Sequence, residues 1–63
     1  MANAEPGEVF IEYTQIGNIM RVTAVDAATG TEVTFQAPAN ASPMDLQMTA
    51  MNKLKYVLRK QQE

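Results

Sequence analysis

Two loop signals of different length enclose residues 18–26, and this spacing constrains the fold more than any other feature of the sequence. In front of the segment, Gly17 occupies the first central position of a two-residue hairpin loop, where a positive φ suits glycine. Behind it, residues 27–30 form a four-residue loop that follows Asp26 and ends on Gly30, which is free to adopt a left-handed conformation. The segment 18–26 is therefore predicted to be the middle strand of two successive hairpins.

The two loops independently predict the same apolar face of the sheet. The first loop places Tyr13 opposite Val22, and the second places Phe35 opposite Val22 from the other side. Shifting the first register by one residue would set Tyr13 beside Arg21 and mix polar with apolar side chains. The shared face is formed by Val9, Ile11, Tyr13, Met20, Val22, Ala24, Val33, Phe35 and Ala37.

The predicted strands cover residues 8–16, 18–26 and 31–37 and form an antiparallel meander in the order 1-2-3. Pro38 is expected to end the third strand, because proline has no N–H to donate to the ladder.

One helix is predicted over residues 43–60. Ser42 can cap it, Pro43 suits its first position, and Asp45 favours the positive end of the helix dipole. At 100° per residue the helix carries one apolar stripe, formed by Ala50, Met51, Leu54, Val57 and Leu58, with Met44, Leu46 and Met48 on its margins. This stripe has to cover a large apolar surface, and the shared face of the strands is the one available.

These elements predict an α+β fold. It is a two-layer βββα arrangement, in which a single C-terminal helix packs on one face of a three-stranded antiparallel meander. A chain of 63 residues allows one domain. We expect that domain to span residues 8–60, with a flexible leader at 1–7 and a frayed tail at 61–63.

The other face of the predicted sheet has no covering element. Its candidate interaction residues are Phe10, Ile16, Ile19, Arg21 and Val25. One interpretation is a docking or dimer surface, since Phe10 pairs with Val25 and Ile16 pairs with Ile19. The other is a solvated antiparallel face with two stray apolar pairs. The sequence leaves both open.

Charge is divided between the two parts of the chain. Residues 1–45 carry six acids and one base, a net charge of −5, and residues 46–63 carry four bases and one acid, a net charge of +3. The four bases, Lys53, Lys55, Arg59 and Lys60, are candidate phosphate contacts for RNA or DNA, or they complement the helix dipole. The total of −2 does not favour a general nucleic-acid binder, so nucleic-acid binding is the alternative function.

Two further features of the helix allow two interpretations. Met44, Met48 and Met51 are expected to fill the core, with Met48 the most exposed, although methionines also form adaptable binding surfaces. Tyr56 is expected to lay its ring over a neighbouring loop, although it could also contact a partner.

The composition argues against catalysis. The sequence contains no cysteine and no histidine, which removes thiolate zinc sites, cysteine nucleophiles and the usual general base near neutral pH. Glu12 and Glu32 lie on strands separated by the middle strand, an arrangement typical of surface pairing. No glycine-rich phosphate loop or metal-ligand spacing is present. We therefore expect no enzyme activity, no cofactor and no metal.

The sequence has no apolar run near the roughly 20 residues that span a membrane, and no signal-type apolar region. We expect a cytoplasmic protein that associates with itself or with an unknown protein partner and does not bind a membrane.

Three segments resemble a family of small, uncharacterised bacterial proteins of about this length. They are EVFIEYTQIGN at 8–18, DAATGTEV at 26–33 and PANA at 38–41, and the likeness extends from Glu8 to Lys60. The resemblance implies the βββα layout. It carries over no catalytic or binding residue, since the segments record turn and strand chemistry.

Overall fold

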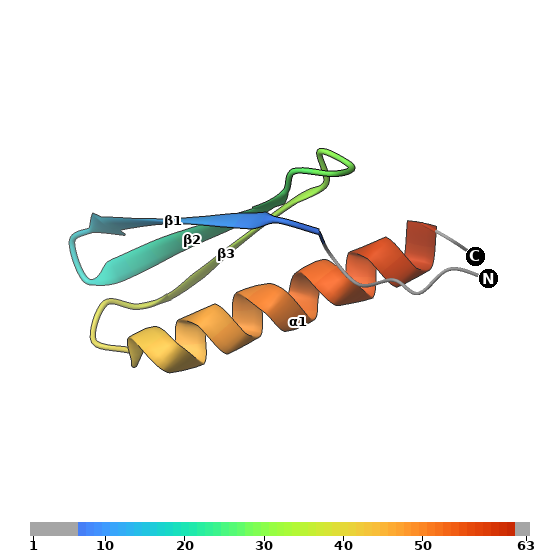
Figure 1. Cartoon of the computed structure of the whole chain (residues 1–63). Helices are drawn as coiled ribbons and strands as arrows, with labels where there is room; N and C mark the ends of the chain where they lie inside the picture. Colours follow the sequence, from blue (N-terminus) through green and yellow to red (C-terminus); the bar gives the residue numbers. More distant parts are fainter. Residues whose placement is uncertain (1–6, 62–63) are drawn as a thin grey trace.

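Three strands and one helix make up the part of the chain that the computed structural model describes, residues 7–61. The strands are β1 (Val9–Ile16), β2 (Ile19–Asp26) and β3 (Glu32–Pro38), and the helix is α1 (Pro43–Gln61). Figure 1 shows the two layers, with the sheet on one side and α1 along the other. The strand order is β1-β2-β3 and every pair is antiparallel, which confirms the predicted fold.

Both predicted registers are confirmed. Tyr13 lies opposite Val22 in the first hairpin, and Phe35 lies opposite Val22 in the second. Gly17 has a φ of 61° and Gly30 has a φ of 74°, so each loop uses the left-handed conformation that glycine adopts without strain. The turn chemistry therefore fixes which side chains share a face.

Small differences occur at the strand ends. β1 and β2 each begin one residue later than predicted, and β3 spans Glu32–Pro38 instead of 31–37. The expectation that Pro38 lies outside the strand is wrong, because Pro38 pairs with Ile19. The ladder tolerates this proline because its nitrogen faces the outer edge of β3, where no hydrogen bond to β2 is lost.

The helix begins as predicted and ends at Gln61, one residue beyond the expected end. The N–H of Asp45 donates to Ser42 Oγ at 3.5 Å, and the N–H of Leu46 donates to the Ser42 carbonyl at 3.0 Å. At the other end, Thr31 Oγ1 donates to Gln61 Oε1 at 3.2 Å. The predicted leader and tail lie outside the described residues, apart from Gly7 and Gln61.

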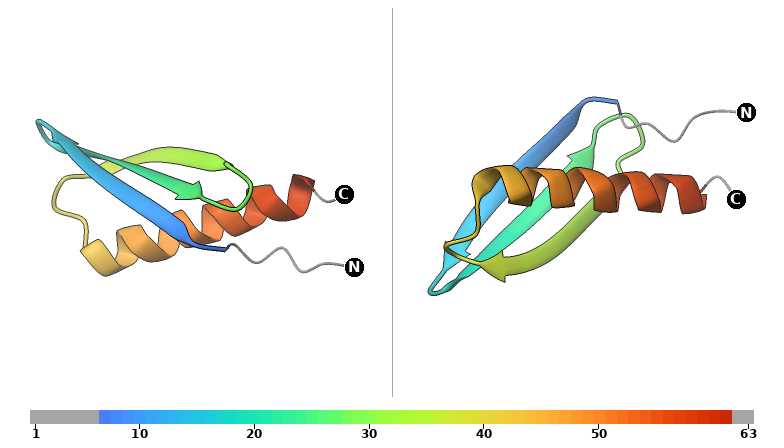
Figure 2. Two further views of the ribbon diagram at one scale, coloured as in Figure 1. Left: turned by 45° about the horizontal axis from the view of Figure 1, so that its top comes forward. Right: turned by 90° about the horizontal axis from the view of Figure 1, so that it is seen from below.

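The core lies between α1 and the middle of the sheet. Its buried apolar residues are Val22, Ala24, Leu46, Ala50, Leu54 and Leu58. The helix contacts β2 and β3 more than β1 and crosses the strands at an angle (Figure 2). Tyr13 therefore stays 45% exposed although it belongs to the helix-facing side of the sheet.

The position of the helix also determines which methionines are exposed to solvent. Met44 is 68% exposed, so the expectation that it fills the core is wrong. The expected exposure of Met48 is confirmed at 57%, although Met44 is more exposed, and Met51 is half-buried. Leu46, placed on the margin of the stripe by the sequence, is buried. The buried stripe is rotated toward β2 and β3 relative to the predicted one.

Asp26 is a buried carboxylate at the end of β2. Its Oδ2 accepts a hydrogen bond from Thr29 Oγ1 at 2.8 Å, and its Oδ1 accepts one from the N–H of Gly7 at 2.9 Å. The Thr29 hydroxyl is the largest cause that holds the Asp26 pKa below its usual 3.8. Burial opposes the shift, and the N–H groups of Gly7, Ala28 and Thr29 add to it. Asp26 thereby ties the start of the described chain to the second hairpin.

Truncation of the core side chain Leu54 should largely unfold the protein. Leu54→Ala is expected to cost about 2–5 kcal/mol, which is comparable to the total stability of a domain this small. Met48→Ala, at an exposed position on the same helix, should change the free energy of unfolding by no more than about 0.5 kcal/mol. Urea denaturation followed by circular dichroism measures both. Equal losses in the two variants would contradict the placement of the core.

Stability should fall in acid through Asp26. Because the folded pKa is lowered, the ionised carboxylate stabilises the fold at pH values above its usual 3.8, and this contribution is lost as the pH falls through the folded pKa. Asp26→Asn should therefore lower the urea midpoint at pH 7, and the gap between variant and wild type should shrink at pH 2–3. A difference in urea midpoint that widens in acid would contradict a stabilising role for the ionised Asp26 carboxylate.

Candidate interaction surface

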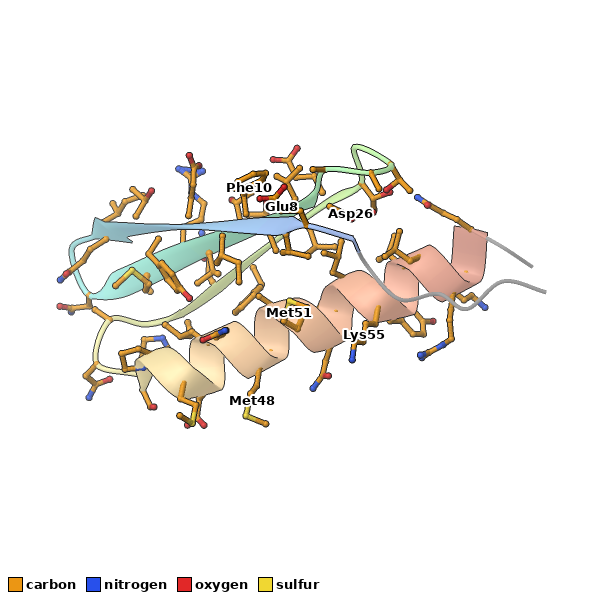
Figure 3. The ribbon with its side chains drawn as sticks, viewed as in Figure 1. Glu8, Phe10, Asp26, Met48, Met51 and Lys55 are labelled. Atoms are coloured by element: carbon orange, nitrogen blue, oxygen red, sulfur yellow. The ribbon has the colours of Figure 1, made fainter. Side chains whose placement is uncertain are left out.

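The open face of the sheet, on the side away from α1, carries two apolar patches at its opposite ends. The Phe10 patch consists of Phe10 and Val25, which are paired across β1 and β2. The Ile16 patch consists of Ile16, Ile19 and Pro38, which lie side by side across all three strands. Figure 3 shows Phe10 on this side of the sheet and Met51 on the other.

These patches are open to solvent. Phe10 is 56% exposed, Ile16 is 53% exposed and Ile19 is 40% exposed, while Val25 is half-buried. The fifth predicted contact residue, Arg21, is exposed between the patches. The structure thus brings all five predicted residues onto one face but divides the apolar ones between its two ends.

The middle of the open face is polar. Thr23 Oγ1 and Thr34 Oγ1 lie 3.2 Å apart and share a hydrogen bond across β2 and β3. Glu12 lies opposite Thr23, and Thr14 lies opposite Arg21. The face therefore presents apolar contacts at its ends and charged or hydroxyl groups between them, a layout that can orient a partner as well as hold it.

A second exposed apolar region lies on α1, on the flank away from β3. Lys53 and Val57 of α1 face β3, because the Lys53 amino group lies 5.7 Å from the centre of the Phe35 ring and Val57 lines a hollow with Val33. Met51 is on the other flank of α1, as successive helical residues are 100° apart. There the methionine row, Met44, Met48 and Met51, lines a shallow hollow with Gln47, Asn52 and Lys55.

The four predicted phosphate contacts do not form one patch. Lys53 lies beside Phe35 on the β3 side, and Lys60 lies over the Tyr56 ring with its amino group 6.0 Å from the ring centre. Lys55 and Arg59 are one helical turn apart on a different flank, since Lys55 is rotated by 200° from Lys53. Phosphate binding by these residues stays a prediction.

Tyr56 is 55% exposed and lines the hollow with Val33 and Thr34. Placement of the ring over a neighbouring loop stays a prediction.

The carboxylates considered for catalysis stay apart. Glu12 pairs with Thr23 and Glu32 pairs with Val25, so β2 separates them, and both are exposed. Within residues 7–61, no three acidic, histidine or cysteine residues are grouped so that they could hold a metal ion. In the same part of the chain, no helix combines the length and the apolar character needed to cross a membrane.

Sequence reasoning missed two features. The sequence places Asp26 at the end of the middle strand and does not identify it as a buried carboxylate that accepts hydrogen bonds from Thr29 and Gly7. The signal that could have found it is an aspartate three residues before a threonine in a tight loop. It also placed Tyr13 in the core, because no local pattern specifies how far a helix lies from the edge of a sheet.

One family model matches almost the whole chain. It is described as Domain of unknown function (DUF6898) and matches residues 6–61. No curated protein and no solved structure matches the chain.

Proposed function

The chain belongs to the DUF6898 family, and we propose that it is a non-catalytic protein-interaction module that docks through the open face of its sheet. The observation that carries the proposal is the exposure of Phe10, Ile16 and Ile19 on one uncovered face. Exposed apolar side chains gathered on one face of a small domain are typical of contact surfaces.

The spacing of the patches defines what a partner must supply. Phe10 and Ile16 lie six residues apart on β1, which corresponds to about 20 Å along a strand. A partner therefore presents apolar groups about 20 Å apart. A second sheet face can do this, and so can an amphipathic helix of about 13 residues. Between them an acidic group would meet Arg21, which is exposed in the middle strand.

The open face also suits a second copy of the chain. When two sheets pack face to face with antiparallel strands, the Phe10 patch of one copy meets the Ile16 patch of the other. Arg21 of one copy then lies near Glu12 of the second, because both belong to the polar middle of the face. Self-association and docking of another protein thus use the same residues.

The alternatives have less support. A catalytic role would have to be performed without histidine or cysteine, which the sequence lacks. Nucleic-acid binding would use four bases that are distributed around α1, and a compact basic surface would favour it more. The proposal includes a bacterial source and a cytoplasmic location as further predictions.

Replacement of the exposed apolar residues should abolish docking. The double variant Phe10→Ser, Ile19→Ser is expected to reduce recovery of partners roughly tenfold or more, because buried contact residues each contribute about 1–2 kcal/mol. The measurement is quantitative mass spectrometry of proteins that co-purify with the tagged chain from its native cell at endogenous level.

Met48→Ser is the matched control, because Met48 is as exposed as Phe10 but lies on the helix. It should leave recovery unchanged, and both variants should keep the circular dichroism of the wild type. Equal recovery with the double variant and the control would contradict a docking role for the open face.

A further inference from the structure

At every second residue of β1, the backbone N–H and C=O groups point away from β2 and pair with no other strand in residues 7–61. The N–H of Ala27 donates to the carbonyl of Glu8 at 2.9 Å, so Glu8 lies at a hydrogen-bonding position. These positions alternate along an antiparallel ladder, so the even-numbered residues of β1 bond to β2. The odd-numbered residues, Val9, Ile11, Tyr13 and Gln15, therefore direct their N–H and C=O groups outward, where the described residues provide no further strand.

The outer edge of β3 is protected, in contrast to that of β1. The N–H of Ala39 donates to the carbonyl of Asn18 at 2.8 Å, so the same alternation turns the even-numbered residues of β3 outward. These are Glu32, Thr34, Gln36 and Pro38. Pro38 has no N–H, and Tyr56 of the helix lines a hollow beside Thr34. β1 is eight residues long and contains no proline, so all its outward N–H groups are present, and Glu12 is its one charged side chain.

The helix leaves the inner side of β1 incompletely covered. Tyr13 is 45% exposed there, and Ile11 and Val9 are half-buried at the margin of the core. The methionine row lies on the flank of α1 away from β3. Apolar surface is therefore exposed on the inner side of β1, beside its outer edge, and separately on α1.

We propose that a second copy of this chain pairs with the first along the outer edge of β1, antiparallel and about a two-fold axis perpendicular to the sheet. The result is a continuous six-stranded sheet with both helices on the same side. The inference rests on the proposed function in one respect, because Phe10 and Ile16 of the open face help to set the register.

Side-chain chemistry selects one register for this pairing. Centred on Glu12, the strands would place the two Glu12 carboxylates directly opposite each other, which is destabilising. Centred on Ile11, they would set Phe10 against Glu12 and leave Ile16 outside the paired segment. Centred on Tyr13, they place Phe10 opposite Ile16, Glu12 opposite Thr14, and the two Tyr13 rings together on the helix side.

The contact area fits a dimer that forms reversibly. Phe10, Tyr13 and Ile16 together leave roughly 300 Å² exposed in each copy. With the edge backbone and the neighbouring side chains of both copies, the buried total is on the order of 1,000 Å², near the lower limit of specific interfaces. The population of the dimer therefore depends on protein concentration. In the dimer, contacts between Phe10 and Ile16 also join the two open faces into one surface.

Cysteine cross-linking tests the edge and its register, because the natural sequence contains no cysteine. Tyr13→Cys should form disulfide-linked dimers under mild oxidation with oxidised glutathione. In the proposed register, Tyr13 of one copy lies directly opposite Tyr13 of the other in a hydrogen-bonded pair. The Cα atoms of such a pair are about 5.5 Å apart, which is within disulfide reach. Glu12→Cys, one residue away, is the matched control. This variant should cross-link at least about tenfold less, because residue 12 of one copy and residue 12 of the other are diagonal neighbours about 7–8 Å apart.

Proline substitution supplies an independent readout by sedimentation velocity over a concentration series. Gln15→Pro removes an outward N–H of β1 and leaves the ladder to β2 intact, so it should raise the dimer dissociation constant roughly tenfold or more. Gln36→Pro makes the same change at the outer edge of β3 and should leave dimerisation unchanged. Circular dichroism melting confirms that both variants remain folded.

Three results would overturn the inference. They are a wild type that stays monomeric throughout the series, equal effects of the two proline variants, or faster cross-linking of Glu12→Cys than of Tyr13→Cys. The last result, together with loss of the dimer in the Phe10→Ser, Ile19→Ser variant, would indicate a face-to-face dimer and leave the proposed function standing. Conversely, edge cross-linking with unchanged partner recovery in that variant would remove the proposed docking role and keep the edge dimer.

Discussion

The packing of one helix against the middle of a three-stranded sheet is the contact on which the rest of the structure depends. Val22 and Ala24 on β2 are fully buried against Ala50 and Leu54 on α1, and few other side chains are excluded from solvent. A core this small makes each buried contact a large fraction of the total stability. Asp26 adds hydrogen bonds to this small core, since its buried carboxylate accepts from Thr29 in the second hairpin and from the N–H of Gly7.

The same contact determines which surfaces stay free. A single helix covers only one side of the sheet, so the Phe10 and Ile16 patches face solvent on the other. The helix lies over β2 and β3, so the inner side of β1 is also open at Tyr13. The two exposed regions meet at β1, whose outer edge pairs with no other strand in residues 7–61. Exposure of apolar groups and of backbone hydrogen-bonding groups at one strand is the physical basis for both proposals.

Much of this fold follows from local chemistry that the sequence displays. Gly17 and Gly30 specify the two loops, the loops specify the registers, and the registers specify the faces. Ser42 and Pro43 likewise specify where the helix begins. The sequence does not specify how α1 is rotated and displaced relative to the sheet, because that depends on how side chains of distant segments fit together. Helical spacing and strand alternation therefore predict Met44 and Tyr13 on the core side, although both are exposed. The candidate interaction residues and their two apolar pairs could be predicted from alternation and the first register. The addition of Pro38 to the Ile16 patch could not, because the third strand was expected to stop before it.

Hydrogen exchange of the β1 amides, measured by NMR at low and high protein concentration, tests whether the outer edge of β1 is open in one copy and pairs with a second. We expect Phe10, Glu12 and Thr14 to be protected at both concentrations, because their N–H groups bond to β2. Ile11, Tyr13 and Gln15 should exchange rapidly in the dilute sample and become protected in the concentrated one, as a second copy pairs with the edge. Uniform protection along β1 in the dilute sample, or exchange rates that do not change with concentration, would contradict this pairing.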